Sequence, residues 1–422
     1  MSDFQTEPIV VVGAGAAGLM AALWAAGGAR PVLLLEGGAR PGKKILISGG
    51  GRCNVLPSRA DPGDFVTDGS PHTLAKILRA WPLTSVRRFF EEDLGIPLRE
   101  EAESGKLFPA SNQAKDVFDA LLAAVNRRGA IVRLGERVSG LAREGDRWLI
   151  RLSSGEHIVA SRVILATGGL SVPATGSDGA GLRIAERLGH TVVPTYPALV
   201  PLTSLLPAHG TLAGVSLPVT LTAPLVGGKR TYVSQGGFLF THRGYSGPAI
   251  LNISHLAVRG AVLGSPPPIW VQWTDLGAVA WDALLRSKAG SIMPLLRGLL
   301  PQRLAEQLLA ETGLTGAVGS QLRREDRTLL VESLTHYRLP WSGHEGYRTA
   351  EVTGGGIPLN EVDPASLESS FAPGLFLCGE MLDAFGPIGG YNFLWAWVTG
   401  RIAGEAARTS VTQGRGEMTK DE

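Results

Sequence analysis

Three glycines near the N-terminus have the spacing GxGxxG, which is typical of a loop that binds the pyrophosphate of a dinucleotide. Gly13 is expected to permit a tight turn, Gly15 to let a phosphate approach the backbone, and Gly18 to bring a helix close to a strand. Glu36 ends the next apolar run, where an acid can accept hydrogen bonds from the adenosine ribose. An acid there favours a free 2′-hydroxyl, so the motif predicts FAD or NAD and disfavours NADP.

A second set of polar residues lies near the C-terminus. The apolar run 375–378 leads into a turn that carries Glu380 and Asp383, and the sequence GGYNF then opens an apolar helix over 394–407. A carboxylate after the last parallel strand can bind the ribityl hydroxyls of a flavin. A glycine-led helix N-terminus can stabilise the negative charge of the reduced ring. Because the chain shows a single dinucleotide motif, these two segments together favour bound FAD.

Four side chains are candidates for the acid of a flavin reaction. Cys53 is the most suggestive, because the neighbouring Arg52 would favour a thiolate, although the residue is slightly more readily explained as a small packing residue. Cys378 ends an apolar strand and is more consistent with a core position. His242 either faces the substrate or holds a loop, and Tyr391 either donates a proton or only covers the ring.

Composition sets the broad class of the protein. The hydrophobic fraction is 44%, the charged fraction is 18% and the net charge is +2, as in ordinary globular proteins. Two cysteines do not support a disulfide framework, so a reducing cytoplasm is the expected setting. The eight histidines are dispersed, without metal-binding spacing, and no metal site is predicted. No apolar run is long enough for a membrane span, and the oligomeric state is left open.

Arginine pairs raise the question of nucleic-acid binding. They occur at 87–88, 127–128 and 323–324, and Arg327 follows the last pair on a helical pattern. Arginine suits phosphate contacts, but scattered pairs on helices are more often solvated faces. Nucleic-acid binding, for example on the helix that carries 323–327, is therefore kept as an open hypothesis.

The motifs lie on an alternating α/β pattern. The apolar runs 9–12, 32–36 and 163–165 flank glycine turns and a helix over 19–26, which predicts a parallel sheet covered on both faces. A basic, glycine-rich loop is expected over 42–54, helices over 73–90 and 116–128, and a small meander over 130–134, 148–152 and 157–158.

A change of texture after His190 indicates an insertion. Residues 191–273 are rich in proline and short β-branched runs, and residues 280–335 are helical and rich in arginine. The glycine-rich, strand-like texture then returns near Tyr347. The predicted domains are an FAD-binding domain over 1–190 and 345–422, a β-rich insert over 191–279 and 336–344, and a helical subdomain over 280–335.

Several motifs together resemble the BaiN-like (YhiN-like) flavoproteins. They are GAGAAGLMAA, GKKILISGGGRCN, ATGGLSVPATGS, LFTHRGYSGPAIL, EVTGGGIPL and CGEMLD…GGYN, and they extend from about Ile9 to Gly404. The resemblance implies a discontinuous Rossmann-like FAD domain of the GR2 type, an inserted β-barrel-like domain and a small helical subdomain. It places around FAD the residues Gly13, Gly15, Ala16, Ala17, Gly18, Glu36, Lys43 or Lys44, Gly50, Gly51, Arg52, Cys53, Asn54, Thr167, Gly168, Gly379, Glu380, Asp383, Gly390, Tyr391 and Asn392, with Val138 near the adenine.

The resemblance also implies an activity. Family members are described as NAD(P)H- and FAD-dependent oxidoreductases, and activities attributed to them include the reduction of steroid-like enones and of a uridine in ribosomal RNA. The prediction is an enzyme that takes hydride from transient NAD(P)H and reduces a conjugated C=C bond in a small molecule or a nucleobase. Cys53, His242 or Tyr391 would then supply the proton. The alternative is an FAD-dependent oxidase of small amines that uses O₂, because the same fold serves both chemistries.

Overall fold

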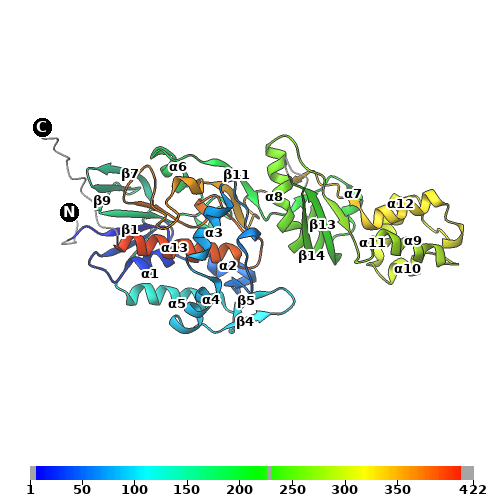
Figure 1. The fold of residues 1–422 in the computed structure, drawn as a ribbon, viewed down its shortest axis with the longest axis horizontal. Helices are drawn as coiled ribbons and strands as arrows, with labels where there is room; N and C mark the ends of the chain where they lie inside the picture. The colour runs from blue at the N-terminus through cyan, green and yellow to red at the C-terminus, as the bar shows by residue number, and fades with distance from the viewer. Residues whose placement is uncertain (1–5, 226–229, 410–422) are drawn as a thin grey trace. The chain divides into compact units, whose positions relative to one another are not determined.

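The computed structural model describes residues 6–225 and 230–409 and divides them into two compact units (Figure 1). Unit 1 is formed by the described residues up to Gly169, by Thr175–Pro194 and by the residues from Gly355 onward, and unit 2 by Leu170–Ala174 and Thr195–Gly354. The unit boundaries at Pro194 and Gly355 fall within β11 (Val193–Ala198) and β19 (Val352–Gly356). The division of the insert into a β-rich and a helical part stays a prediction.

Unit 1 is built on a five-stranded parallel sheet with the order β20-β10-β1-β2-β6. Its strands are β1 (Ile9–Val12), β2 (Val32–Glu36), β6 (Ile131–Leu134), β10 (Arg162–Leu165) and β20 (Leu375–Leu377). Every residue of β1, β10 and β20 is buried, which explains their continuous apolar runs. The Rossmann-like α/β fold with an inserted sheet domain is therefore confirmed.

One strand assignment was wrong. Residues 130–134 were expected to begin a meander, but β6 pairs in parallel with β2 at the edge of the main sheet. The meander is instead formed by β7 (Val138–Glu144), β8 (Arg147–Leu152) and β9 (His157–Ala160). An edge strand is partly exposed, so β6 shows the mixed polarity that a meander strand also has.

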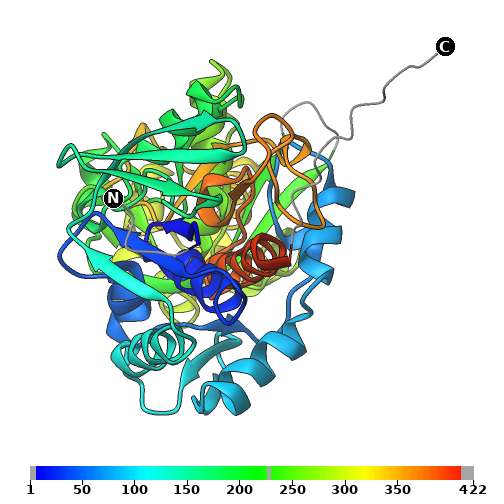
Figure 2. The ribbon, with the colours of Figure 1, turned by 90° about the vertical axis from the view of Figure 1, so that its left-hand side faces the viewer.

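Helices α1 (Ala16–Ala25) and α13 (Tyr391–Thr409) lie side by side against the sheet (Figure 2). The two helices approach closely because α13 presents glycines to α1. A Cβ atom on Gly400 would collide with the carbonyl oxygen of Ala17, and one on Gly404 with that of Ala21. The C-terminal helix is thus held against the helix that follows the GxGxxG turn.

Other expected elements differ in detail. The helical pattern over 73–90 is two helices, α3 (Pro71–Arg79) and α4 (Leu83–Arg88), because Pro82 interrupts it. The loop expected over 42–54 begins as a helical turn, α2 (Lys43–Gly51), whose last residues leave helical geometry. The remaining elements of unit 1 include β3 (Leu56–Pro57), β4 (Leu98–Glu101), β5 (Lys106–Pro109), α5 (Ala114–Arg127) and α6 (Ala180–Arg187).

Unit 2 contains a seven-stranded antiparallel sheet with the order β17-β16-β13-β14-β15-β12-β18. Its strands are β12 (Leu202–Thr203), β13 (Ser216–Pro224), β14 (Thr231–Thr241), β15 (Gly244–Ser246), β16 (Trp270–Gln272), β17 (Tyr337–Arg338) and β18 (Gly343–His344). Helix α8 (Pro248–Val262) contacts β13 and β14. The helical segment consists of α9 (Ala278–Ser287), α10 (Met293–Arg297), α11 (Gln302–Glu311) and α12 (Arg324–Thr335). Among the described residues, no helix is both long and apolar enough to cross a membrane.

Candidate functional site

The GxGxxG turn has the geometry that its spacing predicts. Gly13 has φ +99°, and a Cβ atom on it would lie 2.6 Å from the carbonyl oxygen of Ala166 in the next segment of the sheet. A Cβ atom on Gly18 would collide with the carbonyl oxygen of Gly13. By contrast, a Cβ atom on Gly15 would have no neighbour within 4 Å. Gly13 and Gly18 are therefore required by packing, whereas Gly15 borders open space at the start of α1.

The N-terminus of α1 is available to an anion. Gly15 is the N-cap residue, so no side chain caps the helix, and the first turn of α1 carries no acid. The helix begins at the carboxyl end of β1, where ligands bind in open parallel sheets. The backbone N–H groups of Ala16 and Ala17 and the helix dipole can therefore act on a phosphate at this point.

Glu36 is held in place by backbone donors around the same turn. One carboxylate oxygen accepts from the N–H of Ala14 at 2.9 Å and the other from the N–H of Gly38 at 2.8 Å. The N–H of Glu136 donates to the Glu36 carbonyl at 2.9 Å, which brings the start of β7 beside the end of β2. Val138, the residue expected near the adenine, is buried at that start. These contacts form the adenosine end of the candidate site.

The two lysines of the basic loop have different surroundings. The N–H of Gly42 donates to the carbonyl oxygen of Ala14 at 2.8 Å, so the loop is tied to the GxGxxG turn. Lys44 forms an ion pair of 2.6 Å with Glu380 from the C-terminal segment. Lys43 extends toward the turn after β2, since a Cβ atom on Gly38 would lie 3.2 Å from its Nζ.

Cys53 is not an activated thiol. Its side chain is fully buried, and burial raises the pKa of the thiol to about 12 despite a hydrogen bond with Ser48 that lowers it. Arg52, the cation expected to favour a thiolate, has other partners. Its guanidinium forms a 3.0 Å ion pair with Glu101 and stacks over the ring of Phe108 at 4.1 Å. Of the two interpretations of Cys53, these surroundings favour the packing role over the thiolate, because the Arg52 charge is directed to the β4–β5 hairpin. Cys53 closes the turn after α2 with φ +60°.

The glycines before Cys53 and the asparagine after it shape this turn. Gly50 and Gly51 have φ +68° and +83°, and Cβ atoms on them would have no neighbours within 4 Å. Asn54 lies beside Gly49, whose Cβ atom would be 3.2 Å from the backbone nitrogen of Asn54. The predicted contacts of these residues with FAD stay predictions, but the open backbone at Gly50 and Gly51 leaves room for a ligand.

Thr167 and Gly168 follow β10 and lie against the same turn. A Cβ atom on Gly13 would be 3.2 Å from the Cα atom of Thr167. The Thr167 hydroxyl is buried without a hydrogen-bond partner among the described residues and packs against Gly181 of α6. Gly168 has φ +73°, and a Cβ atom there would lie 2.8 Å from the hydroxyl of Ser177. The segment after β10 therefore faces the dinucleotide turn.

The C-terminal segment reaches the same place. Gly379 has φ +78°, and a Cβ atom on it would be 2.8 Å from the Cβ atom of Ala17 at the start of α1. Its N–H donates to the hydroxyl of Thr399 at 3.0 Å, and its carbonyl accepts from Nε1 of Trp395 at 3.1 Å. Helix α13 therefore holds Gly379 through both backbone groups and sets Glu380 beside Lys44.

Asp383 and Asn392 hold loops at the far end of this segment. The carboxylate of Asp383 is buried and accepts from the N–H of Asp68 at 2.8 Å and from the hydroxyl of Thr67 at 3.4 Å. The side-chain amide of Asn392 bonds to both backbone groups of Gly386, at 2.9 and 3.1 Å. Both predicted flavin ligands thus position the backbone around α13. Sequence patterns did not indicate Thr67 or Asp68, since no motif surrounds them.

Tyr391 and an unexpected lysine lie at the start of α13. Burial raises the pKa of Tyr391, so its phenol stays protonated at neutral pH, and its ring packs edge-on against Phe65 at 5.8 Å. Gly389 and Gly390, with φ +110° and +97°, turn the chain into the helix. A Cβ atom on Gly389 would lie 3.2 Å from Cε of Lys106 on β5. No sequence motif indicates Lys106, because its strand is far from the C-terminal motif in the chain.

The remaining candidate acid lies in unit 2. His242 is exposed in the turn between β14 and β15, and its role stays a prediction. Cys378 is fully buried beneath Leu165, as its core assignment predicted, and burial raises the pKa of its thiol. Among residues 6–225 and 230–409, no group of three or more His, Cys, Asp or Glu side chains could hold a metal ion.

The residues in unit 1 fit FAD. A glycine-lined helix N-terminus and an acid at the end of β2 lie at the open space beside Gly15. The Thr167 hydroxyl after β10 is buried against Gly181 without a hydrogen-bond partner among the described residues. The glycine-led start of α13 belongs to the segment that meets α1 at Gly379. The site therefore combines both ends of the chain, as a bound dinucleotide with a flavin end requires.

Comparisons with known proteins agree with this geometry. The family described as "HI0933-like protein Rossmann domain" matches residues 7–406. The chain is 35% identical to the ribosomal RNA dihydrouridine synthase of Escherichia coli, over 92% of this chain and 94% of that protein. It is 31% identical to the 3-dehydro-bile acid Δ(4,6)-reductase of Clostridium scindens, over 94% of this chain and 98% of that protein.

A solved structure shares the fold. The 3-ketosteroid-Δ4-(5α)-dehydrogenase of Rhodococcus jostii RHA1 superposes with a TM-score of 0.51 at 14% identity, over 97% of this chain and 98% of that one. At this identity the likeness supports the fold alone.

Proposed function

The chain belongs to the HI0933-like Rossmann family and is an FAD-dependent oxidoreductase, and we propose that it uses NAD(P)H to reduce a conjugated carbon–carbon double bond. The observation that carries the proposal is the close approach of Gly379 to Ala17, because the C-terminal segment that would hold the flavin ring then lies beside the dinucleotide turn. The names of the two relatives both describe saturation of a conjugated double bond, one in a uracil ring and one in a steroid ring.

The residues of unit 1 would hold FAD in three ways. The N-terminus of α1 would bind the pyrophosphate, and Glu36 would accept hydrogen bonds from the adenosine ribose. The start of α13 would lie at the ring, where its dipole favours negative charge. When bound, FAD would supply the hydride that the substrate receives.

A protein acid must complete the reduction. Hydride addition to the β-carbon of an enone or a uracil ring leaves negative charge that a proton on the α-carbon removes. Tyr391 is the acid that we favour in unit 1, because its phenol carries a proton at neutral pH and it begins the helix of the flavin segment. Cys53 is less suited, because its fully buried thiol has no access to a substrate.

Anaerobic spectroscopy tests the reductive half of the proposal. The purified protein should carry FAD, and either NADH or NADPH should bleach its visible absorption in a single turnover. If neither NADH nor NADPH bleaches the flavin absorption, NAD(P)H is rejected as the electron donor. Bleaching by a small amine, with release of hydrogen peroxide in air, would instead establish the oxidase alternative.

The oxidative half identifies the substrate class. Reduced protein should regain its absorption without oxygen when it is mixed with a steroid enone or with a uridine-containing RNA fragment. Tyr391→Phe should bleach normally and be reoxidised at least about tenfold more slowly, because only the proton donor is lost. Equal reoxidation rates would reject Tyr391 as the acid.

A further inference from the structure

The sheet of unit 2 has one face that α8 covers and one face that it does not. Along β13, Val219 and Leu221 are buried, while Thr220 and Thr222, which point to the other face, are partly exposed. Along β14, Ser234 is buried and donates to the Ala249 carbonyl of α8 at 2.9 Å. Residues that alternate with these buried ones therefore form an outer face.

Strand pairing aligns the side chains of this face in two rows. In the first row, Thr222 is paired with Val233 on one side and with Trp270 on the other, and Trp270 is paired with Arg338. In the second row, Thr220 is paired with Gln235 and Gln272. We call these seven residues the sheet platform: Thr220, Thr222, Val233, Gln235, Trp270, Gln272 and Arg338.

An aromatic stack lies at one side of the platform. The ring of Trp270 stacks on that of His336, with centroids 4.0 Å apart and planes 12° apart. His336 is exposed at the end of α12, and Trp270 is partly exposed. The pair therefore offers a flat, partly solvated π surface beside the Arg338 cation, rather than a ring buried in the core.

The chemistry of the platform suits a polyanion with planar bases. None of its seven residues is acidic, Arg338 supplies positive charge, and the glutamine and threonine side chains carry both donors and acceptors. Open β-sheets that bind single-stranded RNA use the same combination: a stacking ring, a flanking cation and polar side chains that reach base edges. A duplex would not expose its bases to such a ring.

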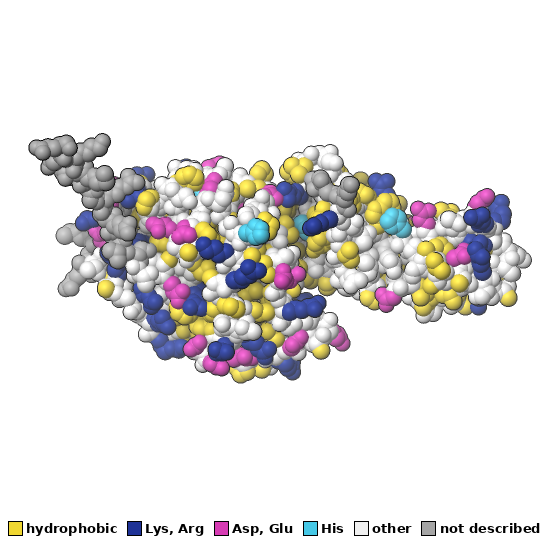
Figure 3. Space-filling view, in the orientation of Figure 1, with side chains coloured by type: hydrophobic (Ala, Val, Ile, Leu, Met, Phe, Trp, Pro, Cys, Tyr) yellow, Lys and Arg dark blue, Asp and Glu magenta, His cyan; other side chains and the backbone are white. Residues whose placement is uncertain are grey.

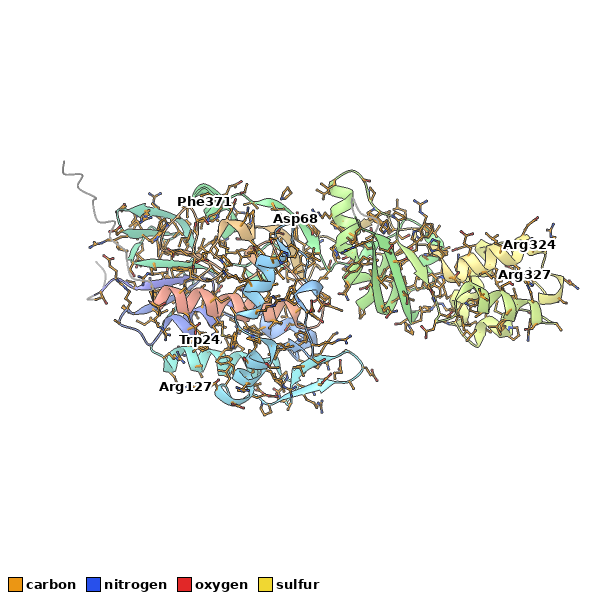
Figure 4. The ribbon with its side chains drawn as sticks, in the orientation of Figure 1. Trp24, Asp68, Arg127, Arg324, Arg327 and Phe371 are labelled. Carbon is orange, nitrogen blue, oxygen red and sulfur yellow. The ribbon has the colours of Figure 1, made fainter. Side chains whose placement is uncertain are left out.

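We propose that the sheet platform of unit 2 binds a single-stranded segment of RNA, with a base stacked on the Trp270–His336 pair. This inference rests on the proposed function, since it selects the uracil ring of an RNA as the substrate class. It also differs from docking on α12, where Arg323 pairs with Asp326 at 3.1 Å and Arg327 with Asp282 at 2.6 Å. Over the helical segment, Lys and Arg side chains lie among Asp and Glu side chains (Figure 3). Arg324 of α12 is exposed (Figure 4), so it offers a control position on that helix.

Fluorescence anisotropy of a labelled twelve-nucleotide oligouridine, titrated with the full-length FAD-loaded protein at low salt, tests the proposal. Trp270→Ala should weaken binding about tenfold through the loss of stacking, and Trp270→Phe should retain most of it. Arg338→Glu should weaken binding by a similar factor and lower its salt dependence. Arg324→Glu on α12 is the matched control and should change binding less than twofold.

Several results would overturn the proposal. One is an unchanged affinity for oligouridine in both Trp270→Ala and Arg338→Glu. A second is a loss of binding in Arg324→Glu that is as large as in those two variants. A third such result is tighter binding of a duplex than of a single strand of the same length. Bleaching by NAD(P)H, measured on each variant, reports separately on the fold and on the proposed function. If wild-type protein binds oligouridine at the platform but is not bleached, the electron donor is wrong and the platform stands.

Discussion

Lys44 and Glu380 form an ion pair of 2.6 Å although they are 336 residues apart in the chain. The pair joins the basic loop after β2 to the turn after β20. Both side chains are mostly buried, with exposed fractions of 25% and 17%. It is thus a link between the N-terminal and C-terminal parts of the candidate flavin site.

Replacing Lys44 should therefore affect both stability and cofactor retention. Lys44→Met removes the cation from the mostly buried Glu380 carboxylate, which should cost about 2 kcal/mol, between the values for exposed and buried pairs. Thermal unfolding and the FAD content after gel filtration measure the two effects. Lys115→Met, which breaks the exposed pair with Asp119, is the control and should leave the unfolding temperature nearly unchanged, because solvent screens that pair. Equal losses in the two variants would contradict the linking role.

The glycines of the first turn should separate folding from binding. Gly18→Ala should destabilise the apoprotein by more than about 2 kcal/mol, because the new methyl group collides with the Gly13 carbonyl. Gly15→Ala should fold normally, since φ is −81° and the methyl group meets no atom within 4 Å. It should nevertheless weaken FAD binding about tenfold or more, because it fills the approach of the phosphate. Denaturant unfolding of the apoprotein measures the stability of each variant, and titration with FAD measures its affinity for the cofactor. A normal FAD affinity in Gly15→Ala would show that the cofactor binds elsewhere.

Lys106 should tune the flavin through its charge. Its side chain lies over Gly389 at the start of α13, so its ammonium adds to the positive end of that helix. Sulfite adds to oxidised flavin and leaves negative charge on the ring, and Lys106→Met should therefore weaken sulfite binding about tenfold. Lys106→Arg keeps the charge and should restore it. Spectral titration with sulfite measures this without turnover, and an unchanged affinity in Lys106→Met would remove Lys106 from the flavin site.

The buried thiol of Cys53 should make stability fall at high pH. Its pKa is about 12 in the folded chain against 9.0 for an ordinary cysteine. Below pH 9 the thiol is neutral in both the folded and the unfolded chain, so its contribution to the free energy of unfolding is fully present. As pH rises from about 9 toward 12, only the unfolded chain ionises, and the contribution is lost. Unfolding at pH 7 and pH 10.5 should show a smaller loss for Cys53→Ala than for wild type.

Alkylation gives an independent measure of the same thiol. Iodoacetamide at pH 8 should leave native protein unmodified at Cys53, because the thiol is buried and neutral. Cys53→Ala should also keep wild-type rates of flavin bleaching and reoxidation within about threefold, as expected for a packing residue. Rapid native alkylation would show that the turn opens and would restore Cys53 as a candidate acid.

Local sequence patterns predicted the structure correctly where the chemistry and packing of a residue depend on one turn, helix or strand. The spacing of Gly13, Gly15 and Gly18 predicts one open and two crowded positions, and the structure has each of them. The pattern failed at Ile131–Leu134, since the partner of a strand depends on residues far away in the chain. It failed again at Arg52, whose position next to Cys53 does not determine which way a long side chain points.

The sequence by itself determined the dinucleotide turn, the acid at the end of β2, the Rossmann-like fold and the family, because each depends on residue types at short, regular spacing. Only the tertiary structure decided that Glu380 meets Lys44, that Lys106 covers Gly389 and that Cys53 is neutral. It also decided which face of β13 is left uncovered by α8. These properties depend on burial and on contacts between segments that are distant in the chain. The physical reason is that desolvation and packing act between residues that are neighbours in space, whatever their separation in sequence.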